Sequence, residues 1–354
     1  MSSSSLPTAA DVVIIGGGFA GVATAWALAR RGVTDVVLLE REAALGKHAS
    51  GRGAGLGRQL VDTDASTALT VRGAALLRGT LGDAWSETGS VLGFADAAEA
   101  DAYEARAARF GVPVERIAPM AGGDLGARWP GLAGAAPAAA LHVPTDGVID
   151  VVRLLARLEA AIDARVFTDA AVLGLEGGRA AGEPHLVRTA RGAISARVVV
   201  EATGAWAGQL LDALPLTVVK RHVFVLERSG GAAAGPWLWQ LGAQELYVRG
   251  HADGTLSSAC DATAAAPGDY TVESGAEAAF RARLATAQPD LARAALVRAW
   301  ACVRTFTSDR QMKLARDPSR PWLVWAIGLG GHGATASPAI GEAVAAAVVD
   351  ALDD

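Results

Sequence analysis

The hydrophobic positions of the first forty residues predict a strand, a helix and a second strand. Residues 11–15 form a short β-branched run, residues 22–30 are helix-forming, and the apolar run 36–39 ends at Glu40. A glycine-rich turn, Gly16-Gly17-Gly18-Phe19-Ala20-Gly21, separates the first strand from the helix. This order of strand, glycine turn, helix, strand and acid is typical of a dinucleotide-binding βαβ unit.

The turn residues have separate tasks in such a unit. Gly16 permits the tight turn, Gly18 lets the backbone approach a pyrophosphate, and Gly21 lets the helix lie close to the strand. The helix N-terminus then faces the phosphates with free N–H groups and the positive end of its dipole. Glu40 can accept hydrogen bonds from a ribose diol, and an acid at this position favours FAD or NAD over NADP.

Further along the chain, the pattern alternates between helical and extended segments. Glycine pairs or Asp-Gly steps at Gly230-Gly231 and Asp253-Gly254 interrupt the extended runs, as they do in hairpins. Together the segments predict an α/β fold. The predicted elements are helices over 150–163, 273–287 and 340–349, a strand over 197–202, and extended runs over 216–227 and 245–260.

Composition narrows the class of protein. The 354 residues are 51% hydrophobic and 19% charged, enough for a large core in one α/β unit or two interleaved domains. A net charge of −5 and a pI of about 5.7 give no basic surface for nucleic acid or anionic lipid. Two cysteines fit a reducing compartment, and residues 1–10 lack the basic and apolar regions of a signal peptide. The apolar stretch 322–349 is interrupted by glycines, Pro338 and Glu342, so we expect a cytoplasmic protein without a transmembrane segment or nucleic-acid partner.

Three separated segments, in order, resemble one known superfamily. Residues 39–55, which include Lys47-His48-Ala49-Ser50-Gly51-Arg52-Gly53-Ala54-Gly55, resemble the flavin-contacting loop of the D-amino-acid oxidase and glycine/sarcosine oxidase superfamily. Residues 198–206, with Ala202-Thr203-Gly204-Ala205-Trp206, are similar to the strand and turn that rejoin its cofactor domain. Residues 329–343 resemble its C-terminal flavin turn and helix. The resemblance covers residues 11–347 and favours FAD over NAD.

This resemblance implies a Rossmann-like FAD-binding domain interleaved with an antiparallel-sheet substrate domain. We place the FAD-binding domain at 1–80, 146–215 and 301–354, and the substrate domain at 81–145 and 216–300. The helix after the last glycine turn would point its N-terminus at the flavin and stabilise the reduced, anionic form. The residues implied to bind FAD are Gly16, Gly18, Phe19, Ala20, Gly21, Glu40, Arg41, Ala49, Ser50, Arg52, Ala54, Gly55, Val172, Thr203, Gly204, Trp206, Cys302, Gly330, Gly331, His332, Gly333 and Ala334.

Four residues are implied to act on substrate. Arg221 and Arg304 match carboxylate-binding positions, in segments that most resemble those of D-arginine and related D-amino-acid dehydrogenases. A guanidinium holds a carboxylate by two parallel hydrogen bonds and so fixes its orientation. Tyr247 is placed where that family often has a substrate-facing tyrosine, and His332 lies between glycines near the flavin. The alternatives are surface or ion-pair arginines, a half-buried sheet tyrosine and a structural histidine.

Cys302 raises a separate question about the cofactor. With Thr305, Thr307 and Asp309 it reproduces a spacing that resembles the covalent flavin site of sarcosine and pipecolate oxidases. The alternative is a small buried hydrophobic residue, the usual state of a free cysteine. Other features depart from the relatives. The lysine with which sarcosine oxidases activate oxygen has no counterpart around residues 257–259, so oxygen and a quinone or other carrier both stay open as electron acceptor.

The sequence therefore predicts FAD-dependent oxidation of the C–N bond of an amino acid, with a D-amino acid preferred. Hydride passes to the flavin, and the imine hydrolyses to an oxo acid. No acid is found that would pair with a cationic side chain, so a preference for D-arginine does not carry over. The alternatives are a secondary-amine oxidase of the sarcosine or pipecolate type, a 2-hydroxy-acid dehydrogenase, and a flavin subunit that relays electrons in a larger complex.

Overall fold

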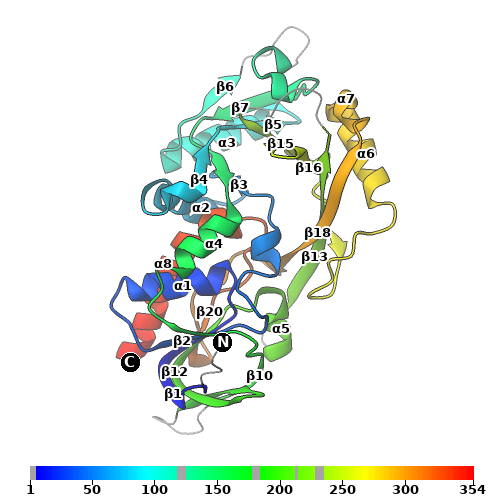
Figure 1. Cartoon of the computed structure of the whole chain (residues 1–354). Helices are drawn as coiled ribbons and strands as arrows, with labels where there is room; N and C mark the ends of the chain where they lie inside the picture. The colour runs from blue at the N-terminus through cyan, green and yellow to red at the C-terminus, as the bar shows by residue number, and fades with distance from the viewer. Residues whose placement is uncertain (1–4, 118–124, 178–183, 212–213, 228–234) are drawn as a thin grey trace.

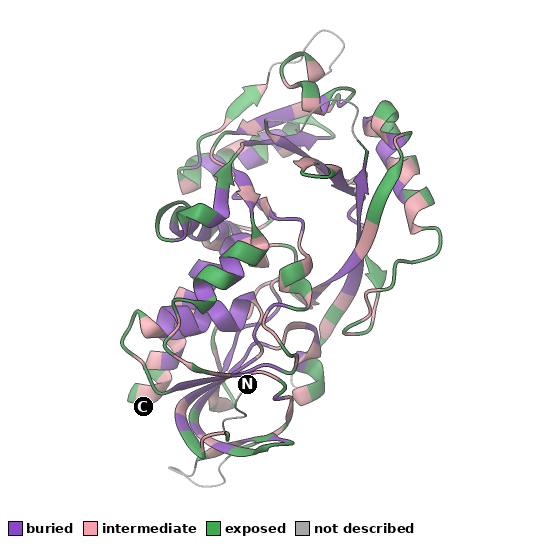
Figure 2. Ribbon diagram, viewed as in Figure 1, coloured by how far each residue is buried: buried purple, intermediate pink, exposed green. Residues whose placement is uncertain are grey.

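The computed structural model describes residues 5–117, 125–177, 184–211, 214–227 and 235–354. It is an elongated α/β molecule with one sheet at each end (Figure 1). The expected break at Gly230-Gly231 lies outside the described residues. Figure 2 shows the central strands of the first sheet mostly in purple, so their residues are buried.

The first sheet contains the predicted βαβ unit in a parallel core with the order β20-β12-β1-β2-β9. Alternate residues of its strands face opposite layers, as the pleat requires. Val12 and Ile14 pack against helices, whereas Val13 and Ile15 pack on the other face. The strands of this sheet are β1 (Ala9–Ile15), β2 (Val36–Leu39), β9 (Arg165–Phe167), β10 (Val172–Glu176), β11 (His185–Thr189), β12 (Gly192–Glu201), β19 (Arg316–Asp317) and β20 (Arg320–Trp325).

Helices cover one face of this sheet, with α1 and α8 in direct contact. A Cβ at Gly341 would lie 2.1 Å from the carbonyl oxygen of Ala23, so glycine permits the close approach. By length and composition α8 could cross a membrane, but 56% of its apolar window is buried in the protein. The helices of this part of the chain are α1 (Phe19–Ala29), α2 (Asp64–Gly79), α4 (Val151–Glu159), α5 (Ala207–Leu210) and α8 (Gly333–Asp353).

Helix α8 begins seven residues earlier than predicted and contains Pro338. Proline has no N–H and leaves the carbonyl four residues earlier without its helical donor. Here the Ser337 hydroxyl donates to that carbonyl, of Ala334, at 3.0 Å. The prediction that the helix starts at Ile340 was wrong because this local replacement lets the helix continue through the proline.

The second sheet is largely antiparallel, as the resemblance implied, with one parallel pair between β5 and β14. Helix α6 begins at Ala276, three residues after the predicted start. A smaller sheet joins β3 (Leu56–Gly57), β8 (Gly147–Ile149) and β4 (Trp85–Glu87). The remaining elements are β5 (Ser90–Phe94), α3 (Ala97–Phe110), β6 (Glu115–Ile117), β7 (Ala139–Val143), β13 (Leu216–Leu226), β14 (Trp237–Gln240), β15 (Leu246–His251), β16 (Gly254–Ser258), β17 (Thr263–Ala264), α6 (Ala276–Ala287), α7 (Pro289–Ala292) and β18 (Leu296–Thr307).

Two long strands, β13 and β18, run from the second sheet down to the first (Figure 1). They pair antiparallel along nearly their whole length, with Arg221 opposite Cys302 and Val219 opposite Arg304. Because side chains alternate along a strand, Arg221 and Arg304 lie on the same face of this ladder. The ladder thus places both predicted arginines between the two sheets. The domain limits drawn from the sequence stay a prediction.

Candidate active site

The glycine turn lies between the ends of β1 and β12. Gly16 has φ +107°, and a Cβ there would lie 2.5 Å from the carbonyl oxygen of Ala202. At Gly21 a Cβ would lie 1.9 Å from the carbonyl oxygen of Gly16, so the helix also needs glycine there. Gly18 is in extended conformation and begins α1 without a side-chain cap. The turn therefore leaves the N-terminus of α1 open toward the adjoining cavity.

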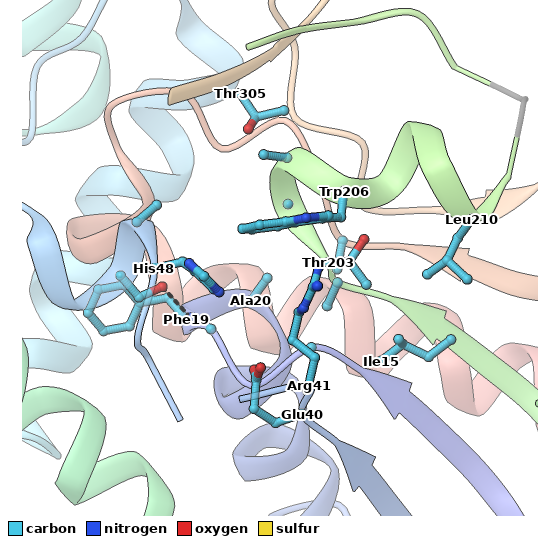
Figure 3. A pocket seen from close by; sticks show the side chains of 18 of the residues that line it. Ile15, Phe19, Ala20, Glu40, Arg41, His48, Thr203, Trp206, Leu210 and Thr305 are labelled. Carbon is cyan, nitrogen blue, oxygen red and sulfur yellow. Dashed lines mark hydrogen bonds between the residues drawn. The ribbon is translucent and has the colours of Figure 1, made fainter. Parts of the chain in front are cut away.

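A cavity of about 410 Å³ begins at this turn (Figure 3). Glu40 lies at its base, where its carboxylate accepts hydrogen bonds from the Gly17 and Glu42 N–H groups, each at 2.8 Å. The Arg41 guanidinium lies 5.1 Å from the Trp206 ring centroid. Of the predicted cofactor residues, those that line this cavity are Gly16, Gly18, Phe19, Ala20, Glu40, Arg41, Ala49, Ser50, Val172, Thr203, Gly204, Trp206 and Gly330.

A second cavity of about 110 Å³ adjoins the first. The two share five lining residues: Phe19, Ala49, Ser50, Leu329 and Gly330. All four residues predicted to act on substrate line the second cavity: Arg221, Tyr247, Arg304 and His332. Ala54, Gly55, Gly331, Gly333 and Ala334 line it as well. The predicted cofactor and substrate residues therefore meet along one continuous hollow.

Cationic side chains line the second cavity. The Nε of Arg221 is buried, and the described residues give it no hydrogen-bond partner. An unpaired buried donor is costly, so this atom favours an anionic ligand. Burial raises the pKa of Tyr247, which keeps its hydroxyl protonated and able to donate. This combination suits a carboxylate.

His332 precedes α8 and is the residue at its N-terminal boundary. Burial, followed by the positive charges of Arg58, Arg221 and Arg304, lowers the pKa of His332 to about 4, against an opposing effect of Asp62. The imidazole is therefore neutral at pH 7 and can both donate and accept a hydrogen bond. A group with so low a pKa is a weak proton acceptor at that pH.

Cys302 is fully buried and lines neither of these two cavities. Its Sγ accepts a hydrogen bond from Nη1 of Arg304 at 2.6 Å and lies 3.7 Å from the carbonyl oxygen of Ala49. The Thr307 hydroxyl of the same motif donates a hydrogen bond to the Asp309 carboxylate at 2.8 Å, in the turn after β18. Covalent attachment of the flavin stays a prediction.

Two other predicted cofactor residues lie outside the two cavities. Gly21 is covered by the turn that it permits. Arg52 lies with its guanidinium 4.1 Å from the Tyr270 ring centroid and faces a separate open hollow beside Arg249 and Trp300. Their contacts with a cofactor, like those of the other predicted site residues, stay predictions.

Sequence reasoning missed several residues that line the hollow. Arg58 and Trp239 line the second cavity, and their side chains stack with the guanidinium 4.6 Å from the ring centroid. His48 lines the first cavity and contacts Trp206 at 4.4 Å between ring centroids. His48 stands within the predicted flavin loop, so its position was a usable signal. Arg58 follows that loop, and nothing in the local pattern indicates that its charge is buried.

A family model that describes FAD-dependent oxidoreductases matches residues 11–347. The chain belongs to that family. The predicted resemblance and the α/β fold class are thereby confirmed, and the protein is an FAD-dependent oxidoreductase. No curated protein matches this oxidoreductase in sequence.

Several solved structures have the same fold as this chain. A glycine oxidase from Geobacillus kaustophilus is 25% identical, with a TM-score of 0.81 over 97% of this chain and 95% of that one. An L-proline dehydrogenase from P. horikoshii is 23% identical, with a TM-score of 0.86 over 96% of this chain and 93% of that one. An iminodiacetate oxidase from Chelativorans sp. BNC1 is 24% identical, with a TM-score of 0.77 over 96% of this chain and 95% of that one. The whole oxidoreductase chain therefore follows the fold of these proteins.

The residues of the oxidoreductase's first cavity fit FAD. The glycine cradle at Gly16 and the N-terminus of α1 would hold the pyrophosphate. Both oxygens of Glu40 keep a free lone pair beside their backbone donors, so the carboxylate can also hold a ribose diol. Ala49 and Gly330, which line both cavities, would contact the part of the cofactor that supplies the redox chemistry.

Proposed function

We propose that this oxidoreductase removes hydride from the Cα of an α-amino acid whose carboxylate is bound by Arg221 and Arg304. The carrying observation is the buried, unpartnered Nε of Arg221 in a cavity continuous with the cofactor cavity. Bound FAD supplies the hydride acceptor. A primary D-amino acid is the preferred substrate, because the segments around both arginines resemble those of D-amino-acid dehydrogenases.

The residues of the chain bind and orient the substrate. Guanidinium groups on one face of the β13–β18 ladder fix the carboxylate, which limits how the Cα–H bond can point. Tyr247 donates a hydrogen bond to the substrate. His332 is neutral, so it donates or accepts a hydrogen bond there and adds no positive charge to that of the arginines. With a pKa of about 4, the His332 imidazole is a weak base at pH 7, and we infer that the substrate amine is already neutral when the Cα–H bond is oxidised.

The chemical change balances with one two-electron acceptor. Hydride leaves Cα and a proton leaves the amine nitrogen, so the C–N single bond becomes C=N. Water then adds to the imine and releases an oxo acid together with ammonia, or with an amine when the substrate nitrogen is secondary. The same site geometry serves either kind of amine.

A secondary amino acid is the second candidate. The spacing of Cys302, Thr305, Thr307 and Asp309 resembles that of sarcosine and pipecolate oxidases. Two of the similar solved structures are named for proline and iminodiacetate, which are secondary amines. For the electron acceptor, Ser257 and Ser258 stand where a lysine activates oxygen in sarcosine oxidases, so we propose a carrier such as a quinone rather than oxygen.

Anaerobic visible spectra of the purified holoenzyme test the proposal. We expect a pool of D-amino acids to bleach the flavin absorbance, and the matched L-pool to bleach it more slowly. Faster bleaching by the L-pool or by N-methyl amino acids would overturn the D-preference alone. An unchanged spectrum with all three pools would contradict amino-acid oxidation, and lactate and glycerol phosphate would then test alcohol substrates.

A further inference from the structure

The second cavity holds more positive charge than one amino-acid carboxylate can compensate. Three guanidinium groups line it, those of Arg58, Arg221 and Arg304, and no aspartate or glutamate is among its described lining residues. Asp62 offers partial compensation from outside the cavity. It lies 3.5 Å from Nη2 of Arg58, and its side chain is 73% exposed, where ion pairs are weak.

Several contacts hold the Arg58 side chain in the second cavity. Its side chain is only 4% exposed, its Nε donates to the carbonyl oxygen of Leu60 at 2.6 Å, and its Nη2 lies 3.2 Å from the Tyr103 hydroxyl. The guanidinium also stacks on Trp239. These contacts fix the group in place and engage Nε and Nη2. Among the described residues its Nη1 has no hydrogen bond and is left for a ligand.

The other two arginines are already assigned to the α-carboxylate. The Nη1 of Arg304 donates a hydrogen bond to the Sγ of Cys302, whereas the buried Nε of Arg221 has no partner among the described residues. A substrate with one carboxylate would complete this pair and leave Arg58 with the exposed Asp62, outside the cavity, as its acidic partner among the described residues. An exposed carboxylate compensates a buried guanidinium weakly, so the arrangement favours a ligand with two anionic groups.

We propose that the substrate is a small dicarboxylic amine whose second carboxylate binds Arg58. This inference rests on the proposed amino-acid oxidation and narrows its substrate class. The cavity, of about 110 Å³, is the smaller of the two, so we expect a small substrate. The same chemistry is present in an N-carboxymethyl amino acid, in which the two carboxylates flank a secondary nitrogen.

Pairs of substrates with and without a second carboxylate test the proposal without any mutation. Flavin bleaching is followed with D-aspartate against D-asparagine, D-glutamate against D-glutamine, and iminodiacetate against N-methylglycine. We expect at least one diacid to exceed its neutral partner by about 100-fold or more in kcat/KM, because the neutral partner offers no anion to the Nη1 of Arg58. The first two pairs identify an acidic amino acid, and the third identifies an N-carboxymethyl compound. Equal kcat/KM within every pair would overturn the proposal.

The variant Arg58→Met tests the residue itself. We expect the diacid-to-neutral ratio to fall below about tenfold, with Arg153→Met on the exposed face of α4 as a control that keeps the wild-type ratio. The flavin absorbance and unfolding temperature establish that each variant is folded. A wild-type ratio in folded Arg58→Met would overturn the role of Arg58.

Calorimetry separates this inference from the proposed oxidation. Succinate and butyrate cannot be oxidised at a C–N bond, and we expect succinate to bind the holoenzyme at least about tenfold more tightly. Bleaching by neutral amino acids with equal binding of the two acids would overturn the dicarboxylate site alone. Tight succinate binding with no bleaching by any amine would support the site and contradict amino-acid oxidation.

Discussion

Replacing Arg221 with methionine separates a substrate-binding role from a structural one. The side chain lines the second cavity, its Nε is buried, and the described residues offer that atom no partner. If the guanidinium exists to hold the substrate carboxylate, Arg221→Met should weaken catalysis without destabilising the protein. A structural ion-pair residue would give the opposite result.

The magnitudes follow from the burial of this group. Removing one partner of a desolvated, charge-assisted pair costs about 3 kcal/mol, or roughly 150-fold in kcat/KM. In the substrate-free enzyme, the same change removes an unpaired buried donor that costs about 1–3 kcal/mol. We therefore expect the free energy of unfolding of Arg221→Met to be equal to the wild type or up to about 1 kcal/mol higher.

The neighbouring residue provides a matched control. Lys220 is buried on the opposite face of β13, where its Nζ bonds Asp269 at 2.7 Å and Glu273 at 2.6 Å. Lys220→Met should lower the unfolding temperature, because it leaves both carboxylates without their partner, and should spare the KM for substrate. Thermal unfolding and steady-state kinetics on both variants decide the case. A destabilised Arg221→Met with unchanged kcat/KM would refute the reasoning.

Three further predictions concern the cofactor turn, pH and the thiol. Gly16→Ala should lose FAD, because its Cβ would lie 2.5 Å from the carbonyl oxygen of Ala202. Gly32→Ala is the control and should keep FAD, because Gly32 is also at positive φ but has open space around it. The flavin content of each variant after gel filtration is the measurement. His332 has a folded-state pKa of about 4, below its unfolded value, so the free energy of unfolding should fall as the pH drops from about 6.5 toward 4. His332→Gln should flatten that part of the pH profile. An unchanged slope in the variant would count against the low pKa of His332. If Cys302 is linked to FAD, acid-precipitated protein stays yellow and Cys302→Ser releases the colour, whereas wild-type colour entirely in the supernatant excludes the link.

Local motifs allowed much of the cofactor site to be predicted from the sequence. The glycine turn and the acid after β2 depend on residues close together in the chain, so their spacing alone indicates their arrangement. Arg221 and Arg304 were found through the resemblance, although their meeting depends on the antiparallel register of β13 and β18. Propensity misplaced the start of α8, because Pro338 obscured a helix that a serine hydroxyl sustains.

Arg58 could not be found in this way for a physical reason. Its burial depends on Tyr103 from α3 and Trp239 from β14, which lie far from it in the sequence. A charged residue ordinarily lies at the surface, and only the tertiary fold determines that this one does not. The sequence therefore predicted the carboxylate clamp but could not predict the third cation beside it.

The two faces of β13 differ in how their polar side chains are paired. On one face, Lys220 is paired with Asp269 and Glu273, and Nδ1 of His222 lies 2.7 Å from the Asp261 carboxylate, so these groups have partners in the free protein. On the other face, Arg221 has no such partner among the described residues. Because a buried donor without a partner is costly, the free Nε of Arg221 favours binding of a ligand at this point. If Arg221 binds the substrate as we propose, the alternation of side chains along β13 places the charges that stabilise the fold on one face and the substrate-binding guanidinium on the other.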